Sequence, residues 1–314
     1  MAGTVLVGRT AGPARAESYP SRPIRLLVGL APGGVQDLFA RLLAERLSVR
    51  LGAPVVVENR PGAGTNIATE AVVRAAPDGY TLLLVGVPNA INASLYTSLP
   101  FDFARDIAPV APLATTPEVL LAHPALPITT VPELIDHAKT YPGTLNIASP
   151  GNGTGPHLSA ELLKMMAGID LVHIPFRGGA PAMTELLAGR VQLLFIAPAV
   201  ALSHLGAGRV RALAVTSAVS CPVLPDVPPL NRFLPGFESG GFFGIGVPVR
   251  TSEQVVERLN RDINAVLAQT EVEQRIRTEG AIVWRGTADD LRRRVALETE
   301  KWGKVIRHAH LQPS

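Results

Sequence analysis

The chain has 314 residues, of which 47% are hydrophobic and 18% charged, and its formal net charge is +3. This length exceeds what one hydrophobic core usually fills, so we expect two domains, and the apolar content excludes a disordered chain. Aromatic residues make up only 5% and no block of basic residues stands out, which argues against nucleic-acid binding, while the single cysteine, Cys221, excludes an intramolecular disulfide and a thiolate metal cluster.

Residues 1–17 are expected to be the remnant of a secretory signal peptide or a disordered tail. The tripeptide Ala14-Arg15-Ala16 has the small-x-small pattern of a signal cleavage site. The apolar run upstream of it is short and no basic residue precedes that run, so a signal peptide would have to start upstream of Met1. No later segment reaches the apolar length of a membrane span, so we expect the mature chain to be soluble.

Strands and helices alternate from the start of the mature chain. Strands are predicted over 24–30, 54–58 and 81–85, with a helix over 36–51 and a second helix after the turn at 59–64. This alternation predicts parallel pairing with right-handed crossovers.

A second α/β set follows a proline-rich region over 100–135, which is predicted to be a crossing segment without regular elements. The return crossing is predicted over 222–235. Between them we expect strands over 145–148, 171–174, 192–196 and 210–216, and helices over 157–166, 182–188 and 200–205. Capped helices that begin near 252, 270 and 287 and an edge strand over 281–284 complete the tail.

Two α/β lobes joined by two crossings predict a hinged binding protein with parallel-type sheets and flanking helices. Residues 18–121 with 238–314 are assigned to the first lobe, and residues 122–237 to the second. The tail helices are expected to pack on the first lobe.

Two glycine-rich turns are the main functional signal. The turns at 31–37 and 149–157 each lie between a predicted strand and a predicted helix. Glycine allows the backbone to approach a ligand, and the start of a helix offers unpaired N–H donors and the positive end of its dipole. The sequence therefore predicts one acidic ligand held from both lobes.

Enzyme motifs are missing from both turns. Neither fits the dinucleotide or phosphate-loop pattern, and Ser149 lacks the preceding glycine of a nucleophile elbow because Ile147 stands there. No His and carboxylate cluster has metal-ligand spacing, so no metal and no cofactor are expected. A small-molecule hydrolase built from distant residues remains the alternative.

A series of short motifs in order along the chain carries a family resemblance. It begins with Tyr19-Pro20-Ser21-Arg22-Pro23-Ile24-Arg25 and Ala31-Pro32-Gly33-Gly34 with Asp37, and continues at 55–64, 76–81, 90–92, 151–157, 172–178, 211–216, 224–228 and 302–305. The chain thereby resembles the Bug family, the extracytoplasmic solute receptors of tripartite tricarboxylate transporters.

The resemblance implies a periplasmic receptor with the Venus-flytrap form of the periplasmic-binding-protein fold and no chemistry of its own. A small carboxylate would be held by backbone groups and ordered water from two loops, which correspond to 31–37 and 149–154. The implied partners are a large and a small membrane subunit, and the receptor is expected to be a monomer.

Twelve residues are candidates for ligand binding. They are Pro32, Gly33, Gly34, Val35, Gln36, Asp37, Asn89, Ser149, Gly151, Gly153, Thr154 and Arg177. Asp37 could orient its loop or cap the helix, and capping is favoured. Ser149 and Thr154 could bind the ligand or cap the next helix. Arg177 could meet a distal carboxylate or be a solvated loop residue.

Three departures from the family pattern leave the ligand open among amino acids, di- and tricarboxylates and aromatic acids. Ile196 stands where relatives commonly carry an acidic residue, the segment 85–89 is altered, and Arg177 replaces the usual lysine. With Pro88 and Phe176, Ile196 favours a ligand less polar than citrate.

Overall fold

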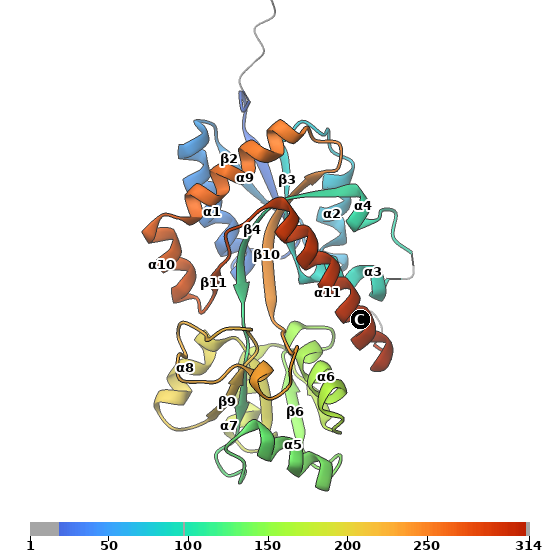
Figure 1. The fold of residues 1–314 in the computed structure, drawn as a ribbon, viewed down its shortest axis with the longest axis vertical. Coiled ribbons are helices and arrows are strands. Elements are labelled where there is room, and N and C mark those ends of the chain that lie inside the picture. The colour runs from blue at the N-terminus through green and yellow to red at the C-terminus, as the bar shows by residue number, and fades with distance from the viewer. Residues whose placement is uncertain (1–18, 97, 312–314) are drawn as a thin grey trace, which may run out of the picture.

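The computed structural model describes residues 19–96 and 98–311. The chain forms two lobes, each built around one β-sheet with flanking helices (Figure 1). Lobe 1 holds a six-stranded sheet in the order β11-β4-β10-β3-β1-β2, and lobe 2 a five-stranded sheet in the order β7-β6-β8-β5-β9. The predicted two-lobe α/β fold is confirmed.

Lobe 1 is made by the two ends of the described chain. Its strands are β1 (Ile24–Val28), β2 (Val55–Asn59), β3 (Thr81–Gly86), β4 (Ile107–Thr116), β10 (Gly241–Pro248) and β11 (Ile282–Val283). Its helices are α1 (Val35–Leu51), α2 (Asn66–Val73), α3 (Val87–Leu95), α4 (Phe103–Asp106), α9 (Glu253–Leu267), α10 (Thr270–Thr278) and α11 (Ala288–His308), with a 3-10 turn η1 (Ala63–Thr65).

Lobe 2 is made by the middle of the chain. Its strands are β5 (Val119–Ala122), β6 (Asn146–Ser149), β7 (Val172–Pro175), β8 (Leu193–Ile196) and β9 (Arg211–Val215). Its helices are α5 (Val131–Thr140), α6 (Gly155–Ala167), α7 (Gly179–Leu187) and α8 (Pro198–Gly206), with a 3-10 turn η2 (Leu230–Arg232).

Apolar runs at the start of the chain form the parallel part of the lobe 1 sheet. Strand β1 pairs in parallel with both β2 and β3, so that Leu26 lies opposite Val57 on one side and Leu82 on the other. Helix α1 then ends at Gly52, which takes the left-handed conformation (φ 68°) that glycine adopts without strain. The predicted parallel pairing of these three strands is confirmed.

Both sheets are mixed, whereas parallel-type sheets were predicted. Strand β10 runs antiparallel to β3 and β4, and β5 runs antiparallel to β8 and β9. Each of β10 and β5 is the strand with which the chain enters its lobe after a crossing. Both strands enter their sheets at the edge where the parallel strands end, so they run against those strands. The apolar pattern of a strand gives no signal of its direction.

The proline-rich region over 100–135 contains α4, the strands β4 and β5 and the start of α5, so the prediction of a crossing without regular elements was wrong. Strand β4 contains Pro109 and Pro112, which lie opposite Gly246 and Gly244 of β10. The register between β4 and β10 shifts next to these glycines. Because proline lacks an N–H donor, it is found in strands mainly where the pairing is irregular, as it is here.

The chain changes sheet at 117–118 and again at 239–240. Strand β5 begins at Val119 and belongs to lobe 2, so the boundary predicted after residue 121 lies too late in the chain. On the return, Ser239 still bonds Thr216 of lobe 2 and β10 begins at Gly241. The two crossings therefore lie side by side and form the hinge between the lobes.

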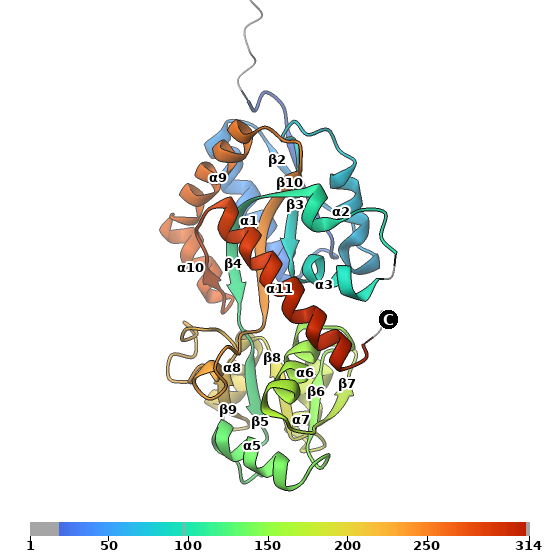
Figure 2. The same ribbon diagram turned by 45° about the vertical axis from the view of Figure 1, so that its right-hand side comes forward.

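One apolar cluster runs through the hinge into both lobes. It joins Leu27 and Phe242 of lobe 1 to Leu120 and Ile147 of lobe 2, and includes the fully buried Trp302 of α11. Helix α11 contacts α3 and β4 and also reaches α6 of lobe 2 (Figure 2). The tail helices were expected to pack on lobe 1, and α11 additionally joins that lobe to the other.

The predicted signal remnant at 1–17 lies outside the described residues. Among the residues that are described, no helix has the length and the apolar content needed to cross a membrane.

Candidate functional site

The carboxyl ends of the parallel strands in the two sheets face one another at the hinge. In lobe 1, Gly86 at the end of β3 lies opposite Phe243, near the start of β10. In lobe 2, Ile196 at the end of β8 lies opposite Val119, the first residue of β5. Strands β1 and β6 run parallel to β3 and β8, so the loops that follow them leave the sheets on the facing sides of the two lobes.

The first glycine loop, residues 29–34, connects β1 to α1. Gly33 has a φ of 91°, in the left-handed region, and a Cβ on Gly33 or Gly34 would meet no atom within 4 Å. Pro32, Gly33, Gly34 and Val35 are exposed and Gln36 is half-buried. The loop therefore presents bare backbone on the side that faces lobe 2.

Asp37 is buried beneath this loop. One of its carboxylate oxygens accepts hydrogen bonds from the Gly33 amide (3.0 Å) and from Arg41 Nε (2.9 Å), and the other accepts from Asn59 Nδ2 (3.0 Å). The hydrogen bond from Arg41 is the main reason that the pKa of Asp37 falls to about 2. The N-cap residue is Gly34, with no side-chain cap, so Asp37 orients the loop and the favoured interpretation as a helix cap was wrong.

This contact decides which amides of the first loop remain free. Asp37 occupies the Gly33 amide, whereas no hydrogen bond between described residues uses the amides of Gly34, Val35 and Gln36. These three groups open α1, where the helix dipole is positive. They form the part of the first loop that can receive an anion.

The second glycine loop, residues 150–154, connects β6 to α6 and has the same brace. The Gly153 amide donates to Nδ1 of His157 at 2.9 Å, and His157 is the third residue of α6, as Asp37 is the third residue of α1. Gly151 and Gly153 have φ angles of 146° and 71°. Each loop is thus held by a side chain that lies four residues after a left-handed glycine.

The two hydroxyl candidates of the second loop bond within the loop. Thr154 Oγ1 donates to the Gly151 carbonyl at 2.7 Å, and Ser149 Oγ lies 3.1 Å from the same oxygen. Thr154 is the N-cap residue of α6 but makes no side-chain cap bond. Both side chains fix the shape of the loop, and neither caps the helix.

Two neutral histidines lie under the second loop. The rings of His157 and His173 stack with centroids 3.8 Å apart, and His173 Nε2 lies 2.7 Å from Ser149 Oγ. Burial lowers the pKa of both histidines, and with the neighbouring His157 it brings the pKa of His173 to about 4. The pair therefore carries no charge at neutral pH.

A serine next to a histidine is also the geometry of a nucleophile and its base. Ser149, however, is fully buried, and no carboxylate bonds His173 among the described residues. A base with a pKa near 4 would also be weak at neutral pH. The contact fits a structural role better than hydrolysis.

Arg177 is an exposed cation next to the second loop. Its segment is tied to the second loop, because the Phe176 amide donates to the Ser149 carbonyl (2.9 Å) and the Gly178 amide to the Pro150 carbonyl (3.0 Å). Arg177 itself is exposed, and no hydrogen bond or ion pair to another described residue is present. Its guanidinium is available to a ligand carboxylate.

Asn89 is placed differently from the other candidates. It is buried at the start of α3, where its oxygen accepts from the Gly86 amide (2.9 Å) and its amide donates to Thr69 (2.9 Å). Its side chain is therefore used inside lobe 1. Ile196 is 3% exposed and packs in the lobe 2 core, so it gives no support to the prediction of a less polar ligand.

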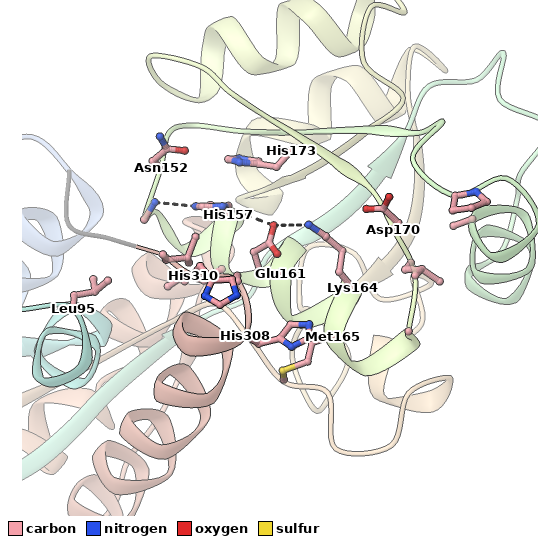
Figure 3. Close-up of a pocket in the computed structure, with 18 of the residues that line it drawn as sticks. Leu95, Asn152, His157, Glu161, Lys164, Met165, Asp170, His173, His308 and His310 are labelled. Carbon is pink, nitrogen blue, oxygen red and sulfur yellow. Dashed lines mark hydrogen bonds and ion pairs between the residues drawn. The ribbon is translucent and has the colours of Figure 1, made fainter.

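A cavity of about 1070 Å³ lies beside the second loop, between lobe 2 and the end of α11 (Figure 3). It is lined by Asn152 and His157 from the second loop and α6, by Lys164 further along α6, and by His308 of α11. The first glycine loop does not line it. Among the described residues, no three His, Cys, Asp or Glu side chains are placed to hold a metal ion.

One buried residue near the second loop was missed by the sequence reasoning. Glu118 lies in the first crossing and is 6% exposed. The available signal was a lone carboxylate between Pro117 and the apolar strand β5, since an isolated acidic residue beside a buried strand is unusual.

The chain matches the family model for the tripartite tricarboxylate transporter family receptor over residues 39–311. The chain belongs to this receptor family. As a curated relative, BugT of Bordetella pertussis is 36% identical to the receptor over 302 residues, which are 95% of this chain and 92% of BugT.

Solved structures resemble the receptor along nearly its whole length. R. palustris Rpa4515 with adipate is 34% identical with a TM-score of 0.76, and the match covers 94% of this chain and all of that one (100%). MatC (Rpa3494) from Rhodopseudomonas palustris with bound malate is 32% identical with a TM-score of 0.72, over 92% of this chain and 100% of that one.

Proposed function

We propose that this receptor captures a small carboxylate between its two lobes in the periplasm and delivers it to a tripartite membrane transporter. The observation that carries the proposal is the pair of matching glycine loops on facing sides of the lobes. Each loop opens a helix and is braced from below by the third residue of that helix. Membership of the receptor family and the adipate and malate bound by two similar proteins support it.

The loops bind an anion through backbone donors. In the first loop, the free amides of Gly34, Val35 and Gln36 lie at the positive end of α1 and can donate to the ligand. In the second loop, the amides of Gly155 and His157 lie at the positive end of α6 and can do the same. Asp37 does not repel the ligand strongly, because Arg41 and Asn59 neutralise and bind its carboxylate. Closure about the hinge brings both sets of donors onto one ligand.

Arg177 selects for a second carboxylate. It is the exposed, unpaired cation of the segment tied to the second loop, so it can pair with the far end of a dicarboxylate. The partners are a large and a small membrane subunit. The receptor acts as a monomer and carries out no reaction on its ligand.

A thermal-shift panel of amino acids and of mono-, di- and tricarboxylates tests the function. The protein is first unfolded and refolded to remove ligand from the expression host. A ligand at a hundredfold its Kd raises the free energy of unfolding by about 2.7 kcal/mol, which gives a clear shift. Shifts confined to carboxylates support the receptor, and a panel without any shift contradicts it. Mass spectrometry of the bound compound detects turnover, which would favour a hydrolase.

We predict that Arg177→Ala weakens the binding of a dicarboxylate at least tenfold and leaves the corresponding monocarboxylate nearly unchanged, since a charge-assisted pair contributes about 1.5–3 kcal/mol. The melting temperature should not change, because Arg177 has no partner among the described residues. Isothermal titration measures both affinities. Arg209→Ala is the matched control, since Arg209 is also exposed but precedes β9 at the far end of lobe 2. Equal losses for both ligands would remove Arg177 from the site.

A further inference from the structure

Glu118 forms a buried cluster with residues of both crossings and of α6. Its Oε2 accepts a hydrogen bond from Ser159 Oγ of α6 at 2.6 Å, and Ser159 Oγ lies 2.9 Å from Ser239 Oγ in the second crossing. Glu118, Ser159 and Ser239 are each no more than 6% exposed. The Glu118 carboxyl group is therefore bonded directly to the helix that opens at the second glycine loop, and through Ser159 to the second crossing.

The backbone around Glu118 is equally well connected. The Glu118 amide donates to Thr216 Oγ1 at 2.7 Å, and Thr216 Oγ1 donates to the Ser239 carbonyl at 3.0 Å. The Thr216 amide returns a hydrogen bond to the Glu118 carbonyl at 2.9 Å. The backbone of Glu118 is thus held by hydrogen bonds that link the two crossings.

The second carboxyl oxygen of Glu118 points at the start of α6. Glu118 Oε1 accepts no hydrogen bond from a described residue, and it lies 2.9 Å from where a Cβ on Gly155 would be. Gly155 is the first residue of α6. A carboxyl oxygen without a partner among the described residues therefore lies beside the first residue of α6, close to the helix N-terminus that the second loop offers to a ligand.

Within the described part of the chain, no cation bonds the Glu118 carboxyl group. Strand β8 beside β5 carries no ionisable residue. The titratable groups on the other elements packed around Glu118 are His157, Glu161 and Lys164 on α6, Glu238 in the second crossing and Arg211 on β9. None of these sets its ionisation: burial raises the pKa of Glu118 to about 7, and the hydrogen bond from Ser159 offsets part of that rise.

We propose that ligand binding is coupled to proton uptake by Glu118, because the ligand carboxylate and the Glu118 carboxylate compete for the N-terminus of α6. The inference rests on the proposed function, which places a carboxylate at the second loop. Two negative charges near one partly buried helix end repel each other, and protonation of Glu118 removes the repulsion. The ligand then favours neutral Glu118, and by reciprocity neutral Glu118 favours the ligand.

The sign and size of the effect follow from this linkage. Free Glu118 titrates near pH 7, so it is mostly neutral at pH 6 and ionised at pH 8.5. If the ligand raises the pKa of Glu118 by about one unit, affinity at pH 8.5 is roughly five- to tenfold weaker than at pH 6. Binding at pH 7.5 then takes up about half a proton. The ligand carboxylates stay ionised over most of this range and contribute little.

Isothermal titration in buffers of different ionisation enthalpy measures the affinity and the proton uptake together. Adipate is the first probe, followed by malate and the other dicarboxylates of the panel until one binds. In Glu118→Gln, a neutral mimic, we expect affinity like that of the wild type at pH 6 and little dependence on pH. Glu161→Gln is the matched control. Glu161, on α6, also carries a buried carboxyl group, but it pairs with Lys164 (3.0 Å), so the variant should keep the wild-type pH dependence.

Carbon-13 NMR of the carboxyl groups in the wild-type protein provides a second measurement that does not depend on the folding of a variant. One carboxyl should titrate near pH 7 without ligand and at higher pH with the probe bound. Binding without proton uptake, or with the same pH dependence in Glu118→Gln, would overturn the inference and leave the receptor function standing. If no dicarboxylate bound either protein at any pH, the proposed function would fail and the inference with it.

Discussion

Gly33 and Gly34 are neighbours in the first loop, but a side chain would have different effects at the two positions. Gly33 has a φ of 91°, so any other residue there is strained, and its amide is held by Asp37. Gly34 has a φ of −83° and open space where a Cβ would be. A substitution at Gly34 can therefore block the approach of a ligand without disturbing the fold of the loop, whereas a substitution at Gly33 would do both.

We predict that Gly34→Val weakens carboxylate binding at least tenfold and costs no more than about 1 kcal/mol of stability, the usual difference between glycine and valine at an N-cap. The branched side chain would cover the free amides that open α1. Isothermal titration and urea unfolding measure the two effects. Gly206→Val is the control, since Gly206 ends α8 and also has no atom within 4 Å of a Cβ. Unchanged affinity in Gly34→Val would exclude the first loop from the site.

At the scale of elements, α1 and α6 begin alike. In both, the third residue of the helix accepts the amide of a glycine four residues earlier. The acceptor is the ionised Asp37 in α1 and the neutral His157 in α6. The spacing of glycine and acceptor is visible in the sequence, but aspartate is also a common residue of a first helical turn, so spacing alone could not separate a loop brace from a cap.

Asp37 should make stability depend on pH in the acid range. Its pKa is lowered in the folded protein, so its contribution is present above the unfolded value of 3.8 and is lost as the pH falls through about 2. We predict that Asp37→Ala lowers the free energy of unfolding by about 2 kcal/mol at pH 7 and by less at pH 3. Urea unfolding at both pH values measures this.

Asp37→Asn provides the comparison for this prediction. Asparagine can still accept a hydrogen bond from the Gly33 amide but cannot form the ion pair with Arg41. The decrease in the free energy of unfolding at pH 7 should therefore be smaller for Asp37→Asn than for Asp37→Ala. Equal losses at pH 7 and pH 3 in Asp37→Ala would show that packing, and not charge, carries the contribution.

At the scale of the whole molecule, the hinge is more than a flexible joint. Two crossings lie side by side, a carboxyl-centred cluster bonds them to α6, and one apolar cluster continues from lobe to lobe. At the crossings the backbones are too close for a side chain: a Cβ on Gly240 would lie 2.4 Å from the Thr116 carbonyl oxygen. Motion of the lobes must preserve this contact.

We predict that Gly240→Ala lowers the free energy of unfolding by at least about 2 kcal/mol more than Gly236→Ala does. Both glycines have left-handed φ angles, 105° and 85°, which cost alanine about 1–2 kcal/mol at either site. Only Gly240 adds a backbone clash, because a Cβ on Gly236 meets nothing within 4 Å. Chemical unfolding measures the two free energies of unfolding. Equal decreases in the two variants would mean that the two crossings can move apart to admit the side chain at no cost in stability.

The sequence by itself determined the two α/β lobes, the parallel strands β1 to β3, the three tail helices and the two glycine loops, although of those helices only α11 has the predicted side-chain cap. Each of these follows from local information: apolar runs of strand length, helical periodicity, capping residues and glycines before a helix. The family resemblance was readable for the same reason, since its motifs are contiguous segments.

Tertiary structure alone decided the antiparallel strands at the hinge, the burial of Ile196 and Asn89, and the place of Glu118. The prolines of β4 led to the wrong prediction of a crossing without regular elements. A strand accepts them only because its register shifts opposite Gly244 and Gly246, which lie far along the chain. Glu118 meets Ser159 and Ser239 only after both crossings have formed. Burial and long-range hydrogen bonds set the charge of such a residue, and neither is a property of a local segment.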